Sequence, residues 1–223
     1  MTLKKLTTKT TLYMEQVRTE LYKIDMNNSD EILKFYKKHK LYYENLNKAI
    51  DKMTIEEFIL VKQKYCVALE KKGKYIEASN VLEQVYKLLD RLKNKKSKYY
   101  SDFYEKAMFY EGLLLGRQEK YTESNEIFKK LIGIDPKNER YEDWYLTNKE
   151  WLAKKKISIF EYIVIATFLI TILWGNKIFD DNLFIVRLIV FILFIILLVI
   201  KRFYRKFIKL PKPEIQQNNM TNA

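Results

Sequence analysis

Two long apolar segments near the C-terminus constrain the fold of this 223-residue chain more than any other feature. The first, ISIFEYIVIATFLITILW, covers residues 157–174, and the second, LFIVRLIVFILFIILLVI, covers residues 183–200. Eighteen residues of α-helix rise roughly 27 Å, which is close to the ~30 Å hydrocarbon thickness of a bilayer. The segments therefore predict two transmembrane helices, at 157–175 and 183–200.

The short polar connection between the two segments, GNKIFDDN, predicts an antiparallel hairpin. Lysines at 154–156 precede the first segment and five basic residues at 201–209 follow the second, whereas the connection offers one lysine and two aspartates. Positive charge stays on the cytoplasmic side of a membrane. We therefore expect an integral membrane protein with both termini in the cytoplasm, most naturally in a bacterial inner membrane, and a basic tail at 201–223 whose end is disordered.

Two ionisable residues fall inside the predicted spans, Glu161 and Arg187. Each lies about one turn from an end of its helix, so each is expected to extend toward the nearer interface. Contact with a second membrane protein is the alternative for both residues.

The charge of the chain favours an anionic neighbour, because 41 basic residues against 28 acidic ones give a net charge of +13. The first 156 residues mix the two signs and contain no continuous basic run, which is typical of solvated helix faces. Anionic lipids of the inner membrane face are therefore the expected partner, in preference to nucleic acid.

The remaining composition predicts an all-α protein without an active site. Five glycines and three prolines are too few for a chain of many β-turns. With no glycine-rich phosphate loop and no clustered nucleophile, base or metal ligands, we expect no enzymatic activity, no cofactor and no metal. The lone histidine, His39 in KKHK, is predicted to be a solvated surface residue, and the lone cysteine, Cys66, a buried small residue.

Before the apolar segments, two stretches of sequence align with each other without a gap. They are YCVALEKKGKYIEASNVLEQVYKLLD from Tyr65 and EGLLLGRQEKYTESNEIFKKLIGIDP from Glu111. The aligned pairs are Cys66 with Gly112, Leu69 with Leu115, Tyr75 with Tyr121, Ala78 with Ser124, Leu82 with Phe128, and Val85 with Leu131. Internal similarity of this kind is the sequence signature of a protein built from repeats.

These residues resemble the tetratricopeptide repeat (TPR) over about residues 59–92 and 105–138. The resemblance implies a fold in which two antiparallel helices pack closely in each copy, with an aromatic residue just after the turn. Gly73 occupies the turn of the first copy, while Glu119 replaces glycine in the second. Flanking helices at 2–53 and 139–156 are expected to cover the ends of the array, because two repeats alone leave apolar faces open.

The predicted architecture is an all-α, TPR-like solenoid of helical hairpins, residues 1–153, followed by the two-helix transmembrane hairpin. We expect the helix after Pro136 to run directly into the first span. Helix starts are predicted at Ser29-Asp30 and at Thr54, the latter because Glu57 follows three residues later.

Similarity to the TPR family implies that the first helix of each copy lines a concave face that binds a protein or peptide segment. The family's inward positions correspond to Leu60, Gln63, Val67 and Glu70 in the first copy and to Lys106, Phe109, Tyr110, Leu113 and Arg117 in the second. The lysine and asparagine with which some members hold a C-terminal carboxylate are not reproduced, since Gln63 and Val67 stand at two of their positions.

The sequence thus favours a membrane-anchored adaptor or scaffold that binds a protein or peptide partner on the cytoplasmic side. In one form of this hypothesis the protein is a subunit of a membrane complex. The alternative is an oligomeric, membrane-embedded channel or secretion-complex subunit, in which the hairpin carries the function and the helical domain regulates it.

Overall fold

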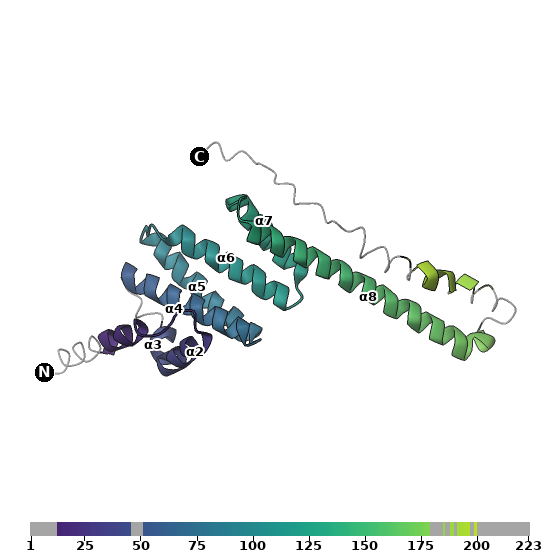
Figure 1. Ribbon diagram of the computed structural model, residues 1–223, viewed down its shortest axis with the longest axis horizontal. Coiled ribbons are helices and arrows are strands. Elements are labelled where there is room, and N and C mark those ends of the chain that lie inside the picture. The colour runs from purple at the N-terminus through teal and green to yellow at the C-terminus, as the bar shows by residue number, and fades with distance from the viewer. Residues whose placement is uncertain are drawn as a thin grey trace. The chain divides into compact units, whose positions relative to one another are not determined.

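The computed structural model describes residues 13–45 and 51–178, together with positions 185, 188–189, 191–196 and 199. All regular structure in these residues is helical, which confirms the all-α prediction. Residues 13–21 form a helix that precedes the labelled ones. The helices that follow are α2 (Ser29–Lys38), α3 (Lys40–Glu44), α4 (Lys52–Lys71), α5 (Tyr75–Asn94), α6 (Tyr100–Arg117), α7 (Tyr121–Ile134) and α8 (Glu139–Ile178) (Figure 1).

The chain divides into two compact units, with the boundary between Ile134 and Asp135. In the first unit, α4 pairs with α5 and α6 pairs with α7, and α5 also packs on α6 (Figure 1). Helix α2 covers α4 on the N-terminal side. Two consecutive helical hairpins therefore stand where the sequence alignment places the two copies.

The two hairpins make the same close contact at aligned positions. In the first hairpin the Cys66 thiol lies 3.5 Å from the carbonyl oxygen of Ala78, and in the second the Ser124 hydroxyl donates to the carbonyl oxygen of Gly112 at 2.5 Å. Cys66 aligns with Gly112 and Ala78 with Ser124, so one small residue from each helix meets its counterpart in both copies. The internal alignment therefore has the correct register.

The turns of the two hairpins are also equivalent. The backbone N–H of Lys74 donates to the carbonyl of Leu69 at 2.9 Å, and that of Lys120 donates to Leu115 at 2.9 Å. Before these lysines, Gly73 has φ +74° and Glu119 has φ +60°. Both residues end a helix in the left-handed conformation, which glycine adopts readily and other residues adopt at a cost. The second copy therefore keeps the turn despite its glutamate.

Exchanging these two turn residues is expected to change the free energy of unfolding in opposite directions. Glu119→Gly should stabilise the protein by about 0.5–1 kcal/mol, because glycine relieves the left-handed backbone. Gly73→Glu should destabilise it by about 1 kcal/mol, since a Cβ added at Gly73 meets no atom within 4 Å and only the backbone conformation is penalised. Denaturant unfolding of both variants checks the prediction, and a change of the same sign in both would contradict it.

Helix α2 begins at Ser29, as predicted, whereas α4 begins at Lys52, two residues before the predicted start at Thr54. Asn28 caps α2, where its side chain accepts from the backbone N–H groups of Asp30 and Glu31. Asp51 caps α4, and its carboxylate accepts from the backbone N–H of Thr54 at 2.9 Å and from the Thr54 hydroxyl at 2.7 Å. Thr54 was predicted to be the cap itself. Asp51 takes this role because a carboxylate is a slightly better capping group than a threonine hydroxyl.

The second unit contains α8, a single helix of 40 residues. It joins the segment predicted to cap the repeats to the first predicted span without a break, as the sequence indicates. Among the residues whose side chains the structure describes, no helix has an apolar stretch long enough to cross a membrane. The described side chains include positions 157–171 of the first predicted span. The rest of that span and eight of the eighteen positions of the second lie outside them.

Candidate functional site

The candidate partner-binding face consists of the exposed sides of α4 and α6, the first helices of the two hairpins. An ion pair joins the two helices there, since Arg117 Nε lies 2.8 Å from Glu70 Oε1. The side chain of Glu70 is 14% exposed and that of Arg117 is 36% exposed. The structure therefore brings together two of the predicted site residues from different copies. An ion pair that is partly open to water contributes about 1 kcal/mol or less.

Four more predicted residues have partly or fully exposed side chains on these two helices. Leu60 is 40% exposed and Val67, two turns further along α4, is half-buried. On α6, Lys106 is exposed and Leu113 is half-buried. Apolar and basic groups thus alternate on a surface that a partner can reach.

Gln63 does not contribute to the candidate face. Its side chain is 3% exposed, and its Nε2 donates to the backbone carbonyl of Phe103 at 2.8 Å. This hydrogen bond ties α4 to α6 inside the unit. Gln63 was assigned to the face because it stands at an inward position of the TPR family, but its amide is buried where α6 supplies a backbone acceptor.

Phe109 and Tyr110 are both half-buried and take part in packing. The Phe109 ring meets Phe128 of α7 edge to face at 5.9 Å, within its own hairpin. Tyr110 packs against the main core cluster. Of the nine predicted residues, these two and Gln63 hold the helices together, so the surface left for a partner is smaller than predicted.

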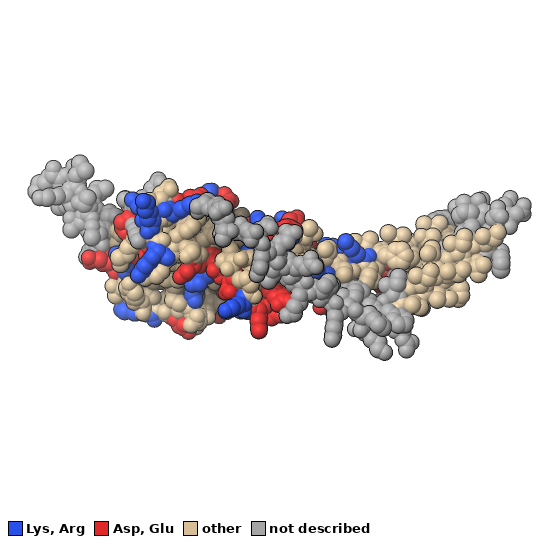
Figure 2. Space-filling view, turned by 90° about the horizontal axis from the view of Figure 1, so that it is seen from above, with Lys and Arg blue, Asp and Glu red and all other residues tan. Residues whose placement is uncertain are grey.

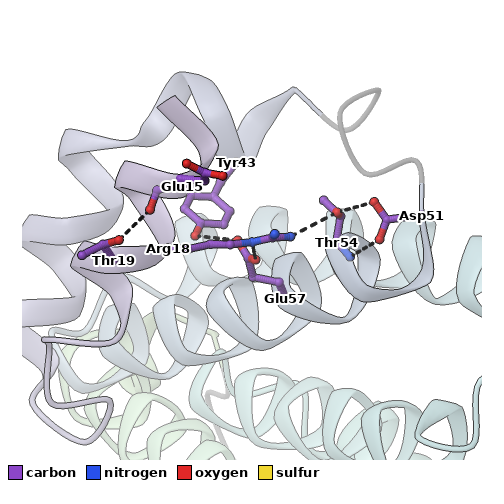
Figure 3. Close-up of polar contacts among 7 residues, drawn as sticks. All are labelled: Glu15, Arg18, Thr19, Tyr43, Asp51, Thr54 and Glu57. Carbon is purple, nitrogen blue, oxygen red and sulfur yellow. Dashed lines mark hydrogen bonds and ion pairs between the residues drawn. The ribbon is translucent and has the colours of Figure 1, made fainter. Parts of the chain in front are cut away.

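A network of polar side chains fixes the N-terminal helix on α4 (Figure 3). Arg18 Nε lies 2.6 Å from Glu57 Oε2, and Arg18 Nη2 donates to the Thr54 hydroxyl at 3.4 Å. Tyr43 donates to the other oxygen of Glu57 at 3.3 Å. The hydrogen bond to Glu57 raises the pKa of Arg18, and burial, with Glu57 as a further cause, raises that of Tyr43. The network joins three helical segments.

Lys62 is a buried cation that sequence reasoning missed. Its side chain is 0% exposed, and its Nζ donates to the Tyr36 hydroxyl at 3.0 Å and to Gln84 Oε1 at 2.6 Å. Both partners are neutral, and burial lowers the pKa of Lys62 to about 8. The signal was present in the sequence, because Lys62 lies four residues after Phe58 and four before Cys66 on the core stripe of α4.

His39 is also buried, contrary to the prediction of a solvated residue, and its exposure is only 2%. Its Nε2 lies 2.8 Å from Glu20 Oε2, and its Nδ1 lies 3.2 Å from the Tyr13 hydroxyl. Hydrogen bonds from Lys38 first and His39 second lower the pKa of Glu20 to about 2. The lysines around His39 in the sequence suggested a surface, but the turn after α2 directs its ring toward the N-terminal helix.

Cys66 is buried as predicted, with 1% exposure, and burial raises the pKa of its thiol to about 12. A thiol with so high a pKa stays protonated and unreactive at neutral pH. Within the described residues, no three His, Cys, Asp or Glu side chains gather in an arrangement that would hold a metal ion.

A second candidate surface is the apolar part of α8, where most of the large apolar side chains are exposed. The exposed large apolar side chains there are Ile159, Phe160, Tyr162, Ile163, Ile165, Phe168, Leu169 and Ile170. Val164 and Thr171 are buried, Ser158 and Glu161 are half-buried, and Thr167 is exposed. Figure 2 shows charged residues scattered over the helical hairpins, whereas the part of α8 beyond its lysines is drawn mostly in tan, the colour of uncharged residues.

Comparison with protein-family models, with curated proteins and with solved structures found no match to this chain. The fold and the two candidate surfaces therefore define its class by themselves, as an all-α protein of consecutive helical hairpins with an exposed apolar helix.

Proposed function

We propose that this protein is a membrane-anchored, TPR-like scaffold that binds a protein or peptide segment on the cytoplasmic side. The observation that carries the proposal is the exposed apolar surface of α8. Between residues 159 and 170 its exposed side chains are mostly large and apolar, with individual exposures from 40% to 70%. An apolar surface of this kind is stable when lipid or another protein covers it.

The polar groups of the same helix support lipid as the covering environment. The Thr167 hydroxyl donates to the carbonyl of Ile163 at 2.8 Å, and the Thr171 hydroxyl donates to that of Thr167 at 2.8 Å. Each hydroxyl is therefore satisfied by its own helix, which removes the cost of placing it in hydrocarbon. Lysines at 154–156 stand at the start of the apolar segment, where anionic lipid headgroups would meet them.

The second predicted span supports the same anchor. Its described apolar side chains, at positions 185, 188–189, 191–196 and 199, are 38–54% exposed. Basic residues at 201–209 follow it, so a hairpin with both ends on the positively charged side satisfies both segments.

The proposed partner-binding function rests on the resemblance of the two aligned copies to TPR repeats and on the surface of α4 and α6. Leu60, Val67 and Leu113 supply apolar contact area, while Lys106 supplies positive charge. Arg117 and Glu70 form an ion pair on the same face. A partner segment with apolar side chains next to acidic ones complements this surface.

The test is a pair of matched double variants in the full-length protein. Leu60→Asp with Lys106→Glu changes the candidate face at two exposed positions and leaves the core intact. The control, Ile76→Asp with Lys129→Glu, makes the same chemical changes on α5 and α7, where both residues are exposed. After purification from the native membrane in mild non-ionic detergent, recovery of a stoichiometric partner should fall at least about tenfold for the face variant only.

Replacing residues 157–200 by an unrelated transmembrane hairpin with the same basic flanks distinguishes the scaffold from its alternative. A scaffold should keep its partner after this exchange, since the hairpin serves only as an anchor. If the exchange abolishes function and the face variant is silent, the membrane-embedded oligomer is the correct reading and the scaffold proposal fails.

A further inference from the structure

A pocket opens between α5 and α6 on a side of α6 that the candidate face does not use. Its floor is apolar and consists of Leu82, Leu114 and Leu115. At 3.6 residues per turn, the α6 residues that line it lie roughly 140° around the helix axis from those of the candidate face. The pocket is therefore a separate surface from the α4–α6 face.

Two side-chain hydrogen bonds cross from α5 to α6 along this pocket. At one end Gln118 Nε2 donates to the Ser79 hydroxyl at 2.9 Å. At the other end the Tyr86 hydroxyl donates to Glu111 Oε2 at 2.5 Å. Burial, with Glu111 as the next cause, raises the pKa of Tyr86, so the hydroxyl keeps its proton. Glu111 is therefore held as the acceptor, with its carboxylate pointing at the pocket.

Aromatic rings extend the Glu111 end of the pocket. The Tyr104 ring meets that of Tyr86 edge to face at 6.1 Å, and the Tyr100 ring stacks on Tyr104 at 5.7 Å. Tyr100, Tyr104 and Glu111 recur on one side of α6, because their spacings of four and seven residues approximate whole helical turns. Aromatic rings beside a carboxylate form a favourable environment for a cation.

The charges around the pocket leave Glu111 without a cationic partner. Glu83 lies on the rim but pairs with Lys87 at 2.8 Å. Lys120 lines the opposite end of the pocket, in the turn that follows α6. Within the described part of the chain, Glu111 takes part in no ion pair, and its one hydrogen bond is to the neutral Tyr86.

We propose that this pocket binds a peptide segment of a partner protein in which a leucine-like residue adjoins an arginine or lysine. The apolar side chain occupies the floor of leucines, and the cation lies against Glu111 and the tyrosine rings. The arrangement combines a buried apolar contact with a charge-assisted hydrogen bond, which is stronger than a hydrogen bond between neutral groups. This site does not depend on the proposed function of the α4–α6 face.

The test uses two fluorescein-labelled pentapeptide amides, one with a central Leu-Leu-Arg sequence and one with Leu-Leu-Glu at the same positions. Binding of each to the full-length protein in non-ionic detergent is measured by fluorescence polarisation. The arginine peptide should bind at least about tenfold more tightly than the glutamate peptide. Glu111→Gln should weaken binding of the arginine peptide by about tenfold, because it removes the charge while the amide oxygen still accepts from Tyr86.

Asp102→Asn is the matched control, since it removes an exposed carboxylate from the same helix on a side away from the pocket. It should leave binding of the arginine peptide unchanged, as should the Leu60→Asp, Lys106→Glu face variant. Equal binding of the two peptides, no saturable binding of either, or an unchanged affinity in Glu111→Gln would each overturn the proposal. If the pocket proposal fails in this way while the face variant still loses its partner, the scaffold proposal is unaffected.

Discussion

Gly112→Leu is expected to destabilise the folded protein by about 3 kcal/mol, at the upper end of the range for overpacked cores. A Cβ at Gly112 would lie 3.0 Å from the ring of Phe128 and 3.2 Å from a methyl group of Ile127. Phe128 is 0% exposed, so its ring has no solvent-filled space to move into. The added side chain must therefore push α6 and α7 apart.

The control for this substitution is Gly133→Ala on α7, where an added Cβ meets no atom within 4 Å. That variant should be as stable as the native protein or up to about 1 kcal/mol more stable, because alanine favours a helix over glycine. Chemical unfolding of the full-length protein measures both. Equal stability of Gly112→Leu and the native protein would mean that α6 and α7 do not approach each other at this position.

Replacing Lys62 by methionine is expected to stabilise the protein at neutral pH by about 1–3 kcal/mol. Methionine has a similar length and needs no hydration, so the substitution removes the cost of holding an ammonium group between two neutral oxygens. The substitution also leaves Gln84 Oε1 without its donor, which costs some stability. This cost is small because the Gln84 side chain is only half-buried.

The effect of Lys62 should also depend on pH, with a definite sign. Burial lowers the pKa of Lys62 from 10.5 to about 8. Below pH 8 the lysine is protonated in both the folded and the unfolded chain, so the full penalty is present. As pH rises from 8 toward 10.5 the folded chain loses its proton first, and the native protein gains stability on the order of 3 kcal/mol.

The pH dependence is read from the difference in unfolding free energy between the native protein and Lys62→Met, measured from pH 7 to 9.5. The difference should shrink as pH rises. Groups whose pKa is raised by folding and that do not contact Lys62, such as Cys66 and Tyr86, lower stability above about pH 9, but they are present in both proteins and cancel. A difference that stays constant with pH would show that Lys62 is not a buried cation.

Much of the first unit follows from the sequence because its two copies repeat the same local rules. The small residues at aligned positions, Cys66 with Ala78 and Ser124 with Gly112, mark the contact within each hairpin. The turn before Lys74 recurs before Lys120 with the same hydrogen bond. These features depend on short-range spacing, which a sequence displays directly.

The errors concern polar residues whose environment is set by distant segments. Gln63 is buried because α6 offers it a backbone carbonyl, and His39 is buried because Glu20 and Tyr13 face it. Local sequence does not reveal these contacts, because the partners lie 19 to 40 residues away in the chain. The candidate face was therefore predicted to be larger than the structure allows, whereas Leu60, Val67, Lys106 and Leu113 remain accessible on it.

The membrane anchor is tested most directly by cysteine labelling in intact cells, with Cys66 replaced by alanine. Single cysteines at Asn182, between the two apolar segments, and at Lys98, before α6, are treated with a membrane-impermeant maleimide. A hairpin with cytoplasmic ends predicts that Asn182→Cys is labelled from outside and that Lys98→Cys is labelled only after the membrane is permeabilised. Labelling of Lys98→Cys in intact cells, or protection of Asn182→Cys until permeabilisation, would contradict the anchored scaffold.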